Sequence, residues 1–163
     1  MTAGPSLGVY VHWPYCARIC PYCDFNVVRA RGRTEEEAAL VSATLADLRG
    51  QAERLGPRRL VSVFFGGGTP SLMPPEAAAQ IVETARALFE PAPDLEITLE
   101  ANPTDAEAAR FKGFAAAGVE RLSLGLQALD DTALASSGAT TTPPRRVGPR
   151  RSPARSSRAC RST

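Results

Sequence analysis

Residues 60–70, with the sequence LVSVFFGGGTP, give the clearest indication of the fold class. Residues 60–65 are apolar apart from one serine, as expected for a parallel strand that is covered on both faces. Three glycines and a Thr-Pro pair follow directly. Three glycines exceed what a tight turn requires, and they let a ligand approach backbone N–H and C=O groups closely. We therefore expect a buried strand that ends in a ligand-binding loop.

Apolar patterns on both sides of this stretch predict an alternation of strands and helices. In chain order we expect strand 7–11, a helix N-capped by Thr34 and ending near Gly56, strand 60–65, helix 75–89, strand 95–99, helix 104–118, strand 121–125 and a short helix over 130–135. The order βαβαβαβ with short loops implies parallel strands joined by right-handed crossovers. Both an open doubly wound α/β sheet and part of a (β/α) TIM-like barrel satisfy this order. In both, ligands bind at the carboxyl ends of the strands.

The charge of the chain is unevenly distributed. Its 163 residues suffice for one domain with a hydrophobic core, and the net charge is +2. Residues 136–163 contain seven arginines and no acidic residue, so the other 12 basic and 17 acidic residues give residues 1–135 a net charge of −5. This balance does not favour a nucleic-acid-binding body, and we expect no nucleic acid as partner.

Residues 136–163 consist almost entirely of Ser, Thr, Pro, Arg, Ala and Gly. Such a composition cannot form a packed core and predicts a disordered tail. A basic tail that binds nucleic acid is one interpretation. We favour a truncated gene or a shifted reading frame, because the patterned sequence stops abruptly near residue 135. We therefore divide the chain into a core over 1–135 and a tail over 136–163.

Three of the four cysteines, Cys16, Cys20 and Cys23, form a CxxxCxxC cluster directly after strand 7–11. They are too close together in the sequence to form disulfide bonds that join distant elements. Metal ligation in a reducing cytoplasm is therefore the better interpretation. We find no secretory signal and no apolar run of membrane-spanning length. Three thiolates can hold a [4Fe–4S] cluster and leave one iron open to a small molecule. The alternative is a zinc knuckle with His12 as fourth ligand, since Cys160 lies in the tail.

Other residues with ligand-binding chemistry also fall at expected strand ends. Tyr10 and Tyr22 are candidates to contact a nucleoside cofactor, although packing aromatics would look the same in the sequence. Glu100 is a candidate acceptor for ribose hydroxyls or an amino group, but a solvated carboxylate is as plausible. Gln127 could equally be a surface amide without a ligand, and the pair Asn102-Pro103 could equally be a simple turn.

Five motifs in this order resemble the oxygen-independent coproporphyrinogen III oxidase family of the radical S-adenosylmethionine (SAM) superfamily. The matching segments are YVHWPYC at 10–16, CPYCDFN at 20–26, FGGGTPS at 65–71, EANP at 100–103 and RLSLGLQ at 121–127. The resemblance covers about residues 7–135. It implies a partial (β/α) barrel with parallel strands and with the cluster at its mouth.

The resemblance also implies cofactor roles for individual residues. Cys16, Cys20 and Cys23 would bind the [4Fe–4S] cluster, and the amino and carboxylate groups of SAM would chelate the open iron. The expected SAM contacts are Tyr10, Tyr22, the segment Gly66 to Thr69 (with Gly67 and Gly68), Glu100 and Gln127, the last toward a second SAM. An electron donor such as flavodoxin or ferredoxin would reduce the cluster. SAM would then split into methionine and a 5′-deoxyadenosyl radical, which abstracts hydrogen from substrate.

Two members of this family compete, a haem chaperone and the true oxidase, which decarboxylates porphyrinogen propionates. Three features favour the chaperone: the short segment before Tyr10, the sequence Asp24-Phe25-Asn26 after the third cysteine, and the pair Pro21-Tyr22. The arginine-containing stretch expected past Gln127 is missing, and the haem or porphyrinogen site is expected in a later part of the family sequence. We therefore assign no catalytic residue and expect the chain as written to be inactive and poorly stable.

Overall fold

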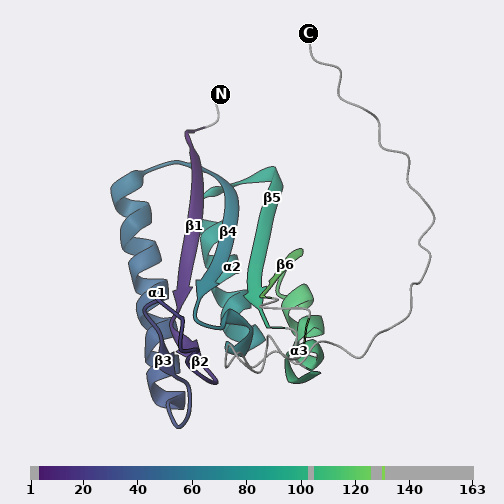
Figure 1. Cartoon of the computed structure of the whole chain (residues 1–163). Coiled ribbons are helices and arrows are strands. Elements are labelled where there is room, and N and C mark those ends of the chain that lie inside the picture. The colour runs from purple at the N-terminus through teal and green to yellow at the C-terminus, as the bar shows by residue number, and fades with distance from the viewer. Residues whose placement is uncertain (1–3, 103–104, 126–129, 131–163) are drawn as a thin grey trace, which may run out of the picture.

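The computed structural model describes residues 4–102, 105–125 and 130, and all statements on structure refer to them. The chain alternates strands and helices (Figure 1). In chain order its elements are β1 (Ser6–Trp13), β2 (Tyr15–Cys16), β3 (Val28–Arg29), α1 (Thr34–Leu55), β4 (Arg59–Gly67), the 3₁₀ helix η1 (Pro70–Leu72), α2 (Pro75–Leu88), β5 (Glu90–Ala101), α3 (Asp105–Ala116) and β6 (Arg121–Leu124).

The main sheet has four parallel strands in the order β1-β4-β5-β6. Each strand therefore pairs with the next one along the chain, and each connection advances in the same direction. Right-handed crossovers then place all three helices on one face, and α2 contacts both α1 and α3. Figure 1 shows α2 behind β4 and β5. A doubly wound sheet reverses its strand order part-way, so the described strands have the winding of a (β/α) barrel.

The core lies between the helix-facing side of the sheet and α2. The central strands contribute Val63 and Phe65 from β4, with Ile97 and Leu99 from β5, all without exposed surface. Helix α2 buries small and branched side chains against them: Ala77, Ala78, Ile81, Val82 and Ala85. The small residues let the helix approach the sheet closely, so the carboxyl ends of β4 and β5 are held by the best-packed part of the molecule.

Strand β5 is longer than expected, because it begins at Glu90 rather than at residue 95. Pro91 and Pro93 lie in its first half. In the structure β6 pairs with β5 only from Thr98 onward, and the pairing of β5 with β4 is irregular between Pro91 and Glu96. Proline is tolerated there because strand edges and bulges leave backbone positions that need no hydrogen-bond donor.

Local details at other element ends also differ from expectation. Thr34 is the first residue of α1 rather than its N-cap; Arg33 occupies the N-cap position and forms an ion pair with Glu36. Strand β4 continues through Gly66 and Gly67, which pair with the end of β1. The short strands β2 and β3 and the helix η1 were not expected, since two or three residues are too few to show a period.

Several predictions fall on residues outside the described ones. They are the short helix over 130–135, the disordered tail over 136–163 and the position of Gln127. Within the described residues, helices of the length and apolar character needed to cross a membrane are absent.

Candidate functional site

The site is built where the carboxyl ends of β1, β4 and β5 meet. After β1 the chain forms β2, which contains Cys16, and β4 ends within the glycine segment, residues 66–69. Two backbone hydrogen bonds join these parts: Gly68 N–H donates to the Trp13 carbonyl at 2.7 Å, and Thr69 N–H donates to the Tyr15 carbonyl at 2.9 Å. The glycine segment is therefore fixed against the chain that leads into the cysteine loop.

The cysteine loop, residues 17–27, is closed at its base by a two-stranded parallel sheet of β2 and β3. Val28 N–H donates to the Pro14 carbonyl, and Ala30 N–H donates to the Cys16 carbonyl, both at 2.9 Å. Cys20 and Cys23 lie in a tight turn of the loop, in which Cys23 N–H donates to the Cys20 carbonyl at 3.1 Å. All three cysteines are free thiols.

Cys16 is buried, with 7% of its surface exposed. Burial raises the pKa of its thiol, a hydrogen bond from the Thr69 hydroxyl opposes this rise in pKa, and nearby Cys23 and Cys20 add to it. Cys16 lies at the base of the loop, and Cys20 and Cys23 lie within it. Three thiols are a donor set suited to iron–sulfur ligation.

In the described part of the chain, no three His, Cys, Asp or Glu side chains surround a single point as the ligands of one metal ion would, and this holds for the three cysteines as well as for the zinc alternative. Both ring nitrogens of His12 have partners: Nδ1 lies 3.1 Å from the Tyr10 hydroxyl and Nε2 lies 3.0 Å from the Asn26 carbonyl oxygen. Because a carbonyl only accepts, Nε2 carries the hydrogen and Nδ1 accepts from Tyr10.

Close packing requires glycine in this segment, in addition to the predicted role in ligand binding. Gly67 has φ of +110°, and a Cβ there would lie 2.7 Å from the His12 ring. A Cβ on Gly68 would lie 2.8 Å from the Pro14 carbonyl oxygen and 2.9 Å from the Cys16 sulfur. The glycine run therefore lets β4 and the cysteine loop approach each other, which the sequence alone did not indicate.

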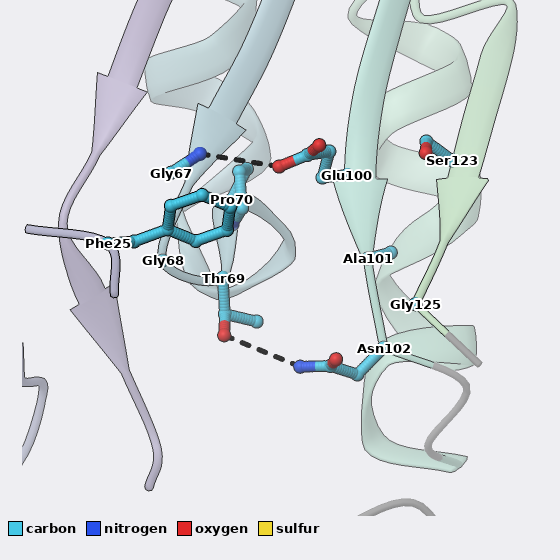
Figure 2. Close-up of a pocket in the computed structure, with 10 residues that line it drawn as sticks. All are labelled: Phe25, Gly67, Gly68, Thr69, Pro70, Glu100, Ala101, Asn102, Ser123 and Gly125. Atoms are coloured by element: carbon cyan, nitrogen blue, oxygen red, sulfur yellow. Dashed lines mark hydrogen bonds between the residues drawn. The ribbon is translucent and has the colours of Figure 1, made fainter. Parts of the chain in front are cut away.

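Glu100 and Asn102, at the end of β5, reach across to the glycine segment (Figure 2). Glu100 Oε2 accepts a hydrogen bond from Gly67 N–H at 3.3 Å, and Asn102 Nδ2 lies 3.4 Å from Thr69 Oγ1. The cavity between these groups is lined by Phe25, Gly67, Gly68, Thr69, Pro70, Glu100, Ala101, Asn102, Ser123 and Gly125.

Four of the predicted SAM-contact residues, Gly67, Gly68, Thr69 and Glu100, line this cavity together. Tyr10 stands beside them: burial raises the pKa of its hydroxyl, and the charge of Glu100 raises that pKa further.

Tyr22 is half exposed on the cysteine loop and does not line the cavity. Burial raises the pKa of its hydroxyl, and a hydrogen bond with Cys20 raises it further. Gln127 lies outside the described residues.

The predicted SAM contacts omit several lining residues, among them Phe25, Asn102 and Ser123. Phe25 follows the third cysteine by two positions and projects to the cavity from the opposite side, but an exposed aromatic has no period that would mark it. Asn102 was expected at a strand end beside Glu100, with a turn as its alternative interpretation, and it was not assigned to SAM. Ser123 alternates with apolar neighbours in β6, which a four-residue strand shows only weakly.

The sequence model described as "Radical SAM superfamily" matches residues 10–160 of the chain. The chain belongs to the radical SAM superfamily. The matched range extends past residue 135. That the family resemblance of this radical SAM chain stops near residue 135 therefore stays a prediction.

Curated relatives of this radical SAM protein fall into two named groups. It is 51% identical over 133 residues to "Radical S-adenosyl methionine domain-containing protein 1, mitochondrial" of Bos taurus, covering 81% of this chain and 29% of that protein. It is 39% identical over 130 residues to the heme chaperone HemW of Escherichia coli, covering 80% and 34%. The chain thus spans about a third of the length of these relatives.

A solved structure shares the fold. It is the coproporphyrinogen III oxidase HemN from Escherichia coli, described as a radical SAM enzyme, with a TM-score of 0.75, 24% identity, and coverage of 86% of this chain and 32% of that one. This likeness and the sequential parallel sheet agree with the predicted partial radical SAM barrel. Membership of the radical SAM superfamily implies SAM and a [4Fe–4S] cluster as cofactors.

Proposed function

We propose that this chain is the cofactor-binding core of a radical SAM protein of haem metabolism, of the haem-chaperone type. The observation that carries the proposal is that the buried Cys16 thiol contacts Thr69, and Glu100 contacts Gly67, at the carboxyl ends of parallel strands, with the free thiols Cys20 and Cys23 in the adjoining loop. Ligands bind at this edge of parallel sheets.

In this proposal Cys16, Cys20 and Cys23 hold the cluster and leave one iron for the amino and carboxylate groups of SAM. The backbone of Gly67, Gly68 and Thr69 lies beside the methionyl part of SAM. Glu100 is fixed by the Gly67 N–H, so one carboxylate oxygen is oriented and the group remains available as an acceptor. Bound together, the cluster and SAM supply a substrate radical by one-electron chemistry.

Tyr10, Tyr22 and Gln127 complete the proposed contacts to SAM. Tyr10 donates its hydroxyl hydrogen to His12, so its oxygen is left to accept a hydrogen bond from the cofactor. The cavity holds about 170 Å³. Whole-ligand pockets usually hold roughly 300–1,000 Å³, so this cavity would enclose part of SAM and the exposed Tyr22 would cover another part.

The chaperone type is supported more strongly than the oxidase. Two relatives named heme chaperone HemW, from Haemophilus influenzae and Escherichia coli, are 40% and 39% identical to the chain. The oxidase HemN shares 24% identity, which supports the fold alone. As the sequence predicts, we assign haem or porphyrin contact to family sequence beyond the described residues, and we propose a cytoplasmic protein reduced by a flavodoxin-like or ferredoxin-like donor.

Anaerobic reconstitution with iron and sulfide tests the cofactor assignment. We expect four irons per chain, a broad absorbance near 400 nm, and loss of both in Cys20→Ser, because three thiolates are the minimum set for this site. Thr44→Val, on the far helix α1, is the control and should retain the cluster. Tight binding of one zinc ion without cluster formation would refute the proposal.

Anaerobic incubation with SAM, reductant and coproporphyrinogen III tests the branch, on a reconstituted protein in which a corrected reading frame restores the later family sequence, because the porphyrinogen site is expected there. A chaperone-type protein should leave the propionates intact, as measured by chromatography of the oxidised porphyrins. Release of carbon dioxide with formation of vinyl groups would support the oxidase instead.

A further inference from the structure

The hydrogen bonds beneath the cysteine loop form a chain of three side chains from three different elements. Asn102 follows β5, Thr69 follows β4, and Cys16 ends β2. Asn102 Nδ2 lies 3.4 Å from Thr69 Oγ1, and Thr69 Oγ1 lies 3.6 Å from Cys16 Sγ, within hydrogen-bond reach for sulfur. Nothing in the assignment of SAM contacts uses Asn102, so its amide requires a separate explanation.

The direction of these hydrogen bonds follows from the groups involved. A threonine hydroxyl has one hydrogen and two lone pairs, and an amide nitrogen only donates. The Asn102 amide therefore occupies a lone pair of Thr69 Oγ1, and the Thr69 hydrogen is directed to the sulfur. Thr69 is 6% exposed and Cys16 is 7% exposed, so water competes little for either group.

A donor to a ligating sulfur has a predictable effect on an iron–sulfur cluster. The reduced cluster carries one more negative charge than the oxidised cluster, and part of that charge resides on the sulfur ligands. Hydrogen bonds to the sulfurs therefore stabilise the reduced state and raise the reduction potential. Outer groups that orient such donors tune the centre without touching it.

We propose that Asn102 is a positioning residue that directs the Thr69 hydroxyl onto the Cys16 sulfur and thereby raises the reduction potential of the cluster held there. The inference rests on the proposed function, because it requires a cluster on Cys16. It separates the side chain of Thr69, which acts on the sulfur, from its backbone, which lies beside SAM. It also gives a physical reason for an asparagine at the end of β5.

The test is an EPR-monitored redox titration of the reconstituted chain and four variants. Thr69→Val keeps the shape and removes the hydroxyl, Thr69→Ser keeps the hydroxyl, and Asn102→Leu removes the amide. The fourth variant combines Thr69→Val with Asn102→Leu. Thr44→Val, whose hydroxyl donates to the Leu40 carbonyl in α1, is the matched control for a lost threonine hydroxyl away from the site.

We expect Thr69→Val to lower the midpoint potential most, Asn102→Leu to lower it less, and Thr69→Ser and Thr44→Val to leave it near that of the unsubstituted chain. The double variant should have the potential of Thr69→Val alone, because Asn102 acts only through the hydroxyl. The Fe–S(Cys) stretching frequency in resonance Raman spectra should rise in the same order, since the sulfur loses its donor.

Two outcomes overturn the inference. One is an Asn102→Leu chain with an unchanged potential, whether or not Thr69→Val still binds a cluster. The other is an Asn102→Leu shift of equal size in the Thr69→Val background, which would show an action independent of the hydroxyl. A cluster in every variant with equal potentials refutes this inference alone, whereas no cluster in the unsubstituted chain refutes the proposed function with it.

Discussion

Cys16 differs from Cys20 and Cys23 in its surroundings, because it is buried in β2 while the other two lie on a partly exposed turn. Its sulfur accepts from Thr69, and its backbone is held by β3. Cys16 is therefore the fixed ligand of the proposed site, and the turn with the other two thiols can adjust to a cluster around it.

The raised pKa of Cys16 predicts a pH dependence of cluster assembly. Burial places this pKa above its ordinary value of 9.0, so the thiol is protonated at neutral pH and must lose its proton to bind iron. Between about pH 7 and pH 9 the thiolate fraction rises about tenfold per unit, and iron affinity should rise with it. Absorbance near 400 nm at limiting iron measures the effect, and a pH-independent extent of assembly would contradict it.

Gly68 leaves no room for a side chain between β4 and the chain that leads into the cysteine loop. Gly68→Ala would bring a Cβ to 2.8 Å from the Pro14 carbonyl oxygen and 2.9 Å from the Cys16 sulfur. We expect a loss of about 1–3 kcal/mol in the free energy of unfolding, measured by urea denaturation, together with reduced iron uptake.

Gly50→Ala is the matched control for this substitution. Gly50 lies inside α1 with no atom within 4 Å of the added Cβ. The change should therefore stabilise the chain by about 0.5–1 kcal/mol, because alanine favours a helix over glycine. Equal effects at Gly50 and Gly68 would contradict the packing described for the glycine segment.

At the scale of elements, α1 and α2 contribute unequally to stability. Helix α1 has 22 residues but buries only Leu48, which also lines a cavity between α1 and β1. Helix α2 has 14 residues and buries five of them. The shorter helix therefore fixes the sheet, and the longer one packs loosely beside it.

Alanine substitutions should reveal this difference. Ile81→Ala in α2 should cost about 3–4 kcal/mol of unfolding free energy, because Ile81 is one of five buried residues of its helix and its neighbours there are held in place. Leu48→Ala in α1 should cost about 2 kcal/mol, since Leu48 is the one buried residue of α1 and its surroundings can adjust more easily. Denaturant unfolding measures both values. A larger loss for Leu48→Ala would contradict the assignment of the core to α2.

The exposed ion pair between Arg121 and Glu96 provides a control at the same scale. Its shortest N–O distance is 3.0 Å, and about half of each side chain is exposed. Pairs of this kind contribute about 0–1 kcal/mol, so Glu96→Gln should change the free energy of unfolding by less than 1 kcal/mol. A loss as large as that of Ile81→Ala would mean that β6 depends on this pair.

The elements with a clear period could be predicted from the sequence, and those without one could not. The apolar run at 60–65 and the 3.6-residue spacing in 75–89 identified β4 and α2. The Pro91 to Pro93 segment was not foreseen as part of β5, because its place depends on where β6 starts to pair. Strand order likewise depends on contacts between distant segments, so the barrel winding was one of two alternatives.

The candidate site was predictable to a similar degree. The cysteine spacing and the glycine run identify its position, because each motif is contiguous in sequence. The contact of Asn102 with Thr69 and that of Phe25 with the cavity join segments more than 30 residues apart, and no local pattern indicates them. The packing reasons for the glycines also became visible only with β1 alongside β4.

At the scale of the whole molecule, the described sheet places Cys16, the glycine segment and Glu100 at the carboxyl ends of its strands, whereas Tyr10 lies within β1. The opposite end is closed by the turns that join helices to strands, such as the one at Gly56. In the described part of the chain, β1 and β6 each have one neighbour in the main sheet. Exposed strand edges favour association with other chains, so a monodisperse sample is a condition for every titration above.

The most direct test of the central claim is the EPR spectrum of the reduced, reconstituted chain before and after addition of SAM under strict exclusion of air. If three cysteines hold the cluster and leave one iron open, SAM must change the g-values of the cluster signal, and Cys20→Ser must show no cluster signal in either condition. An intact cluster whose spectrum stays the same at saturating SAM would contradict the account.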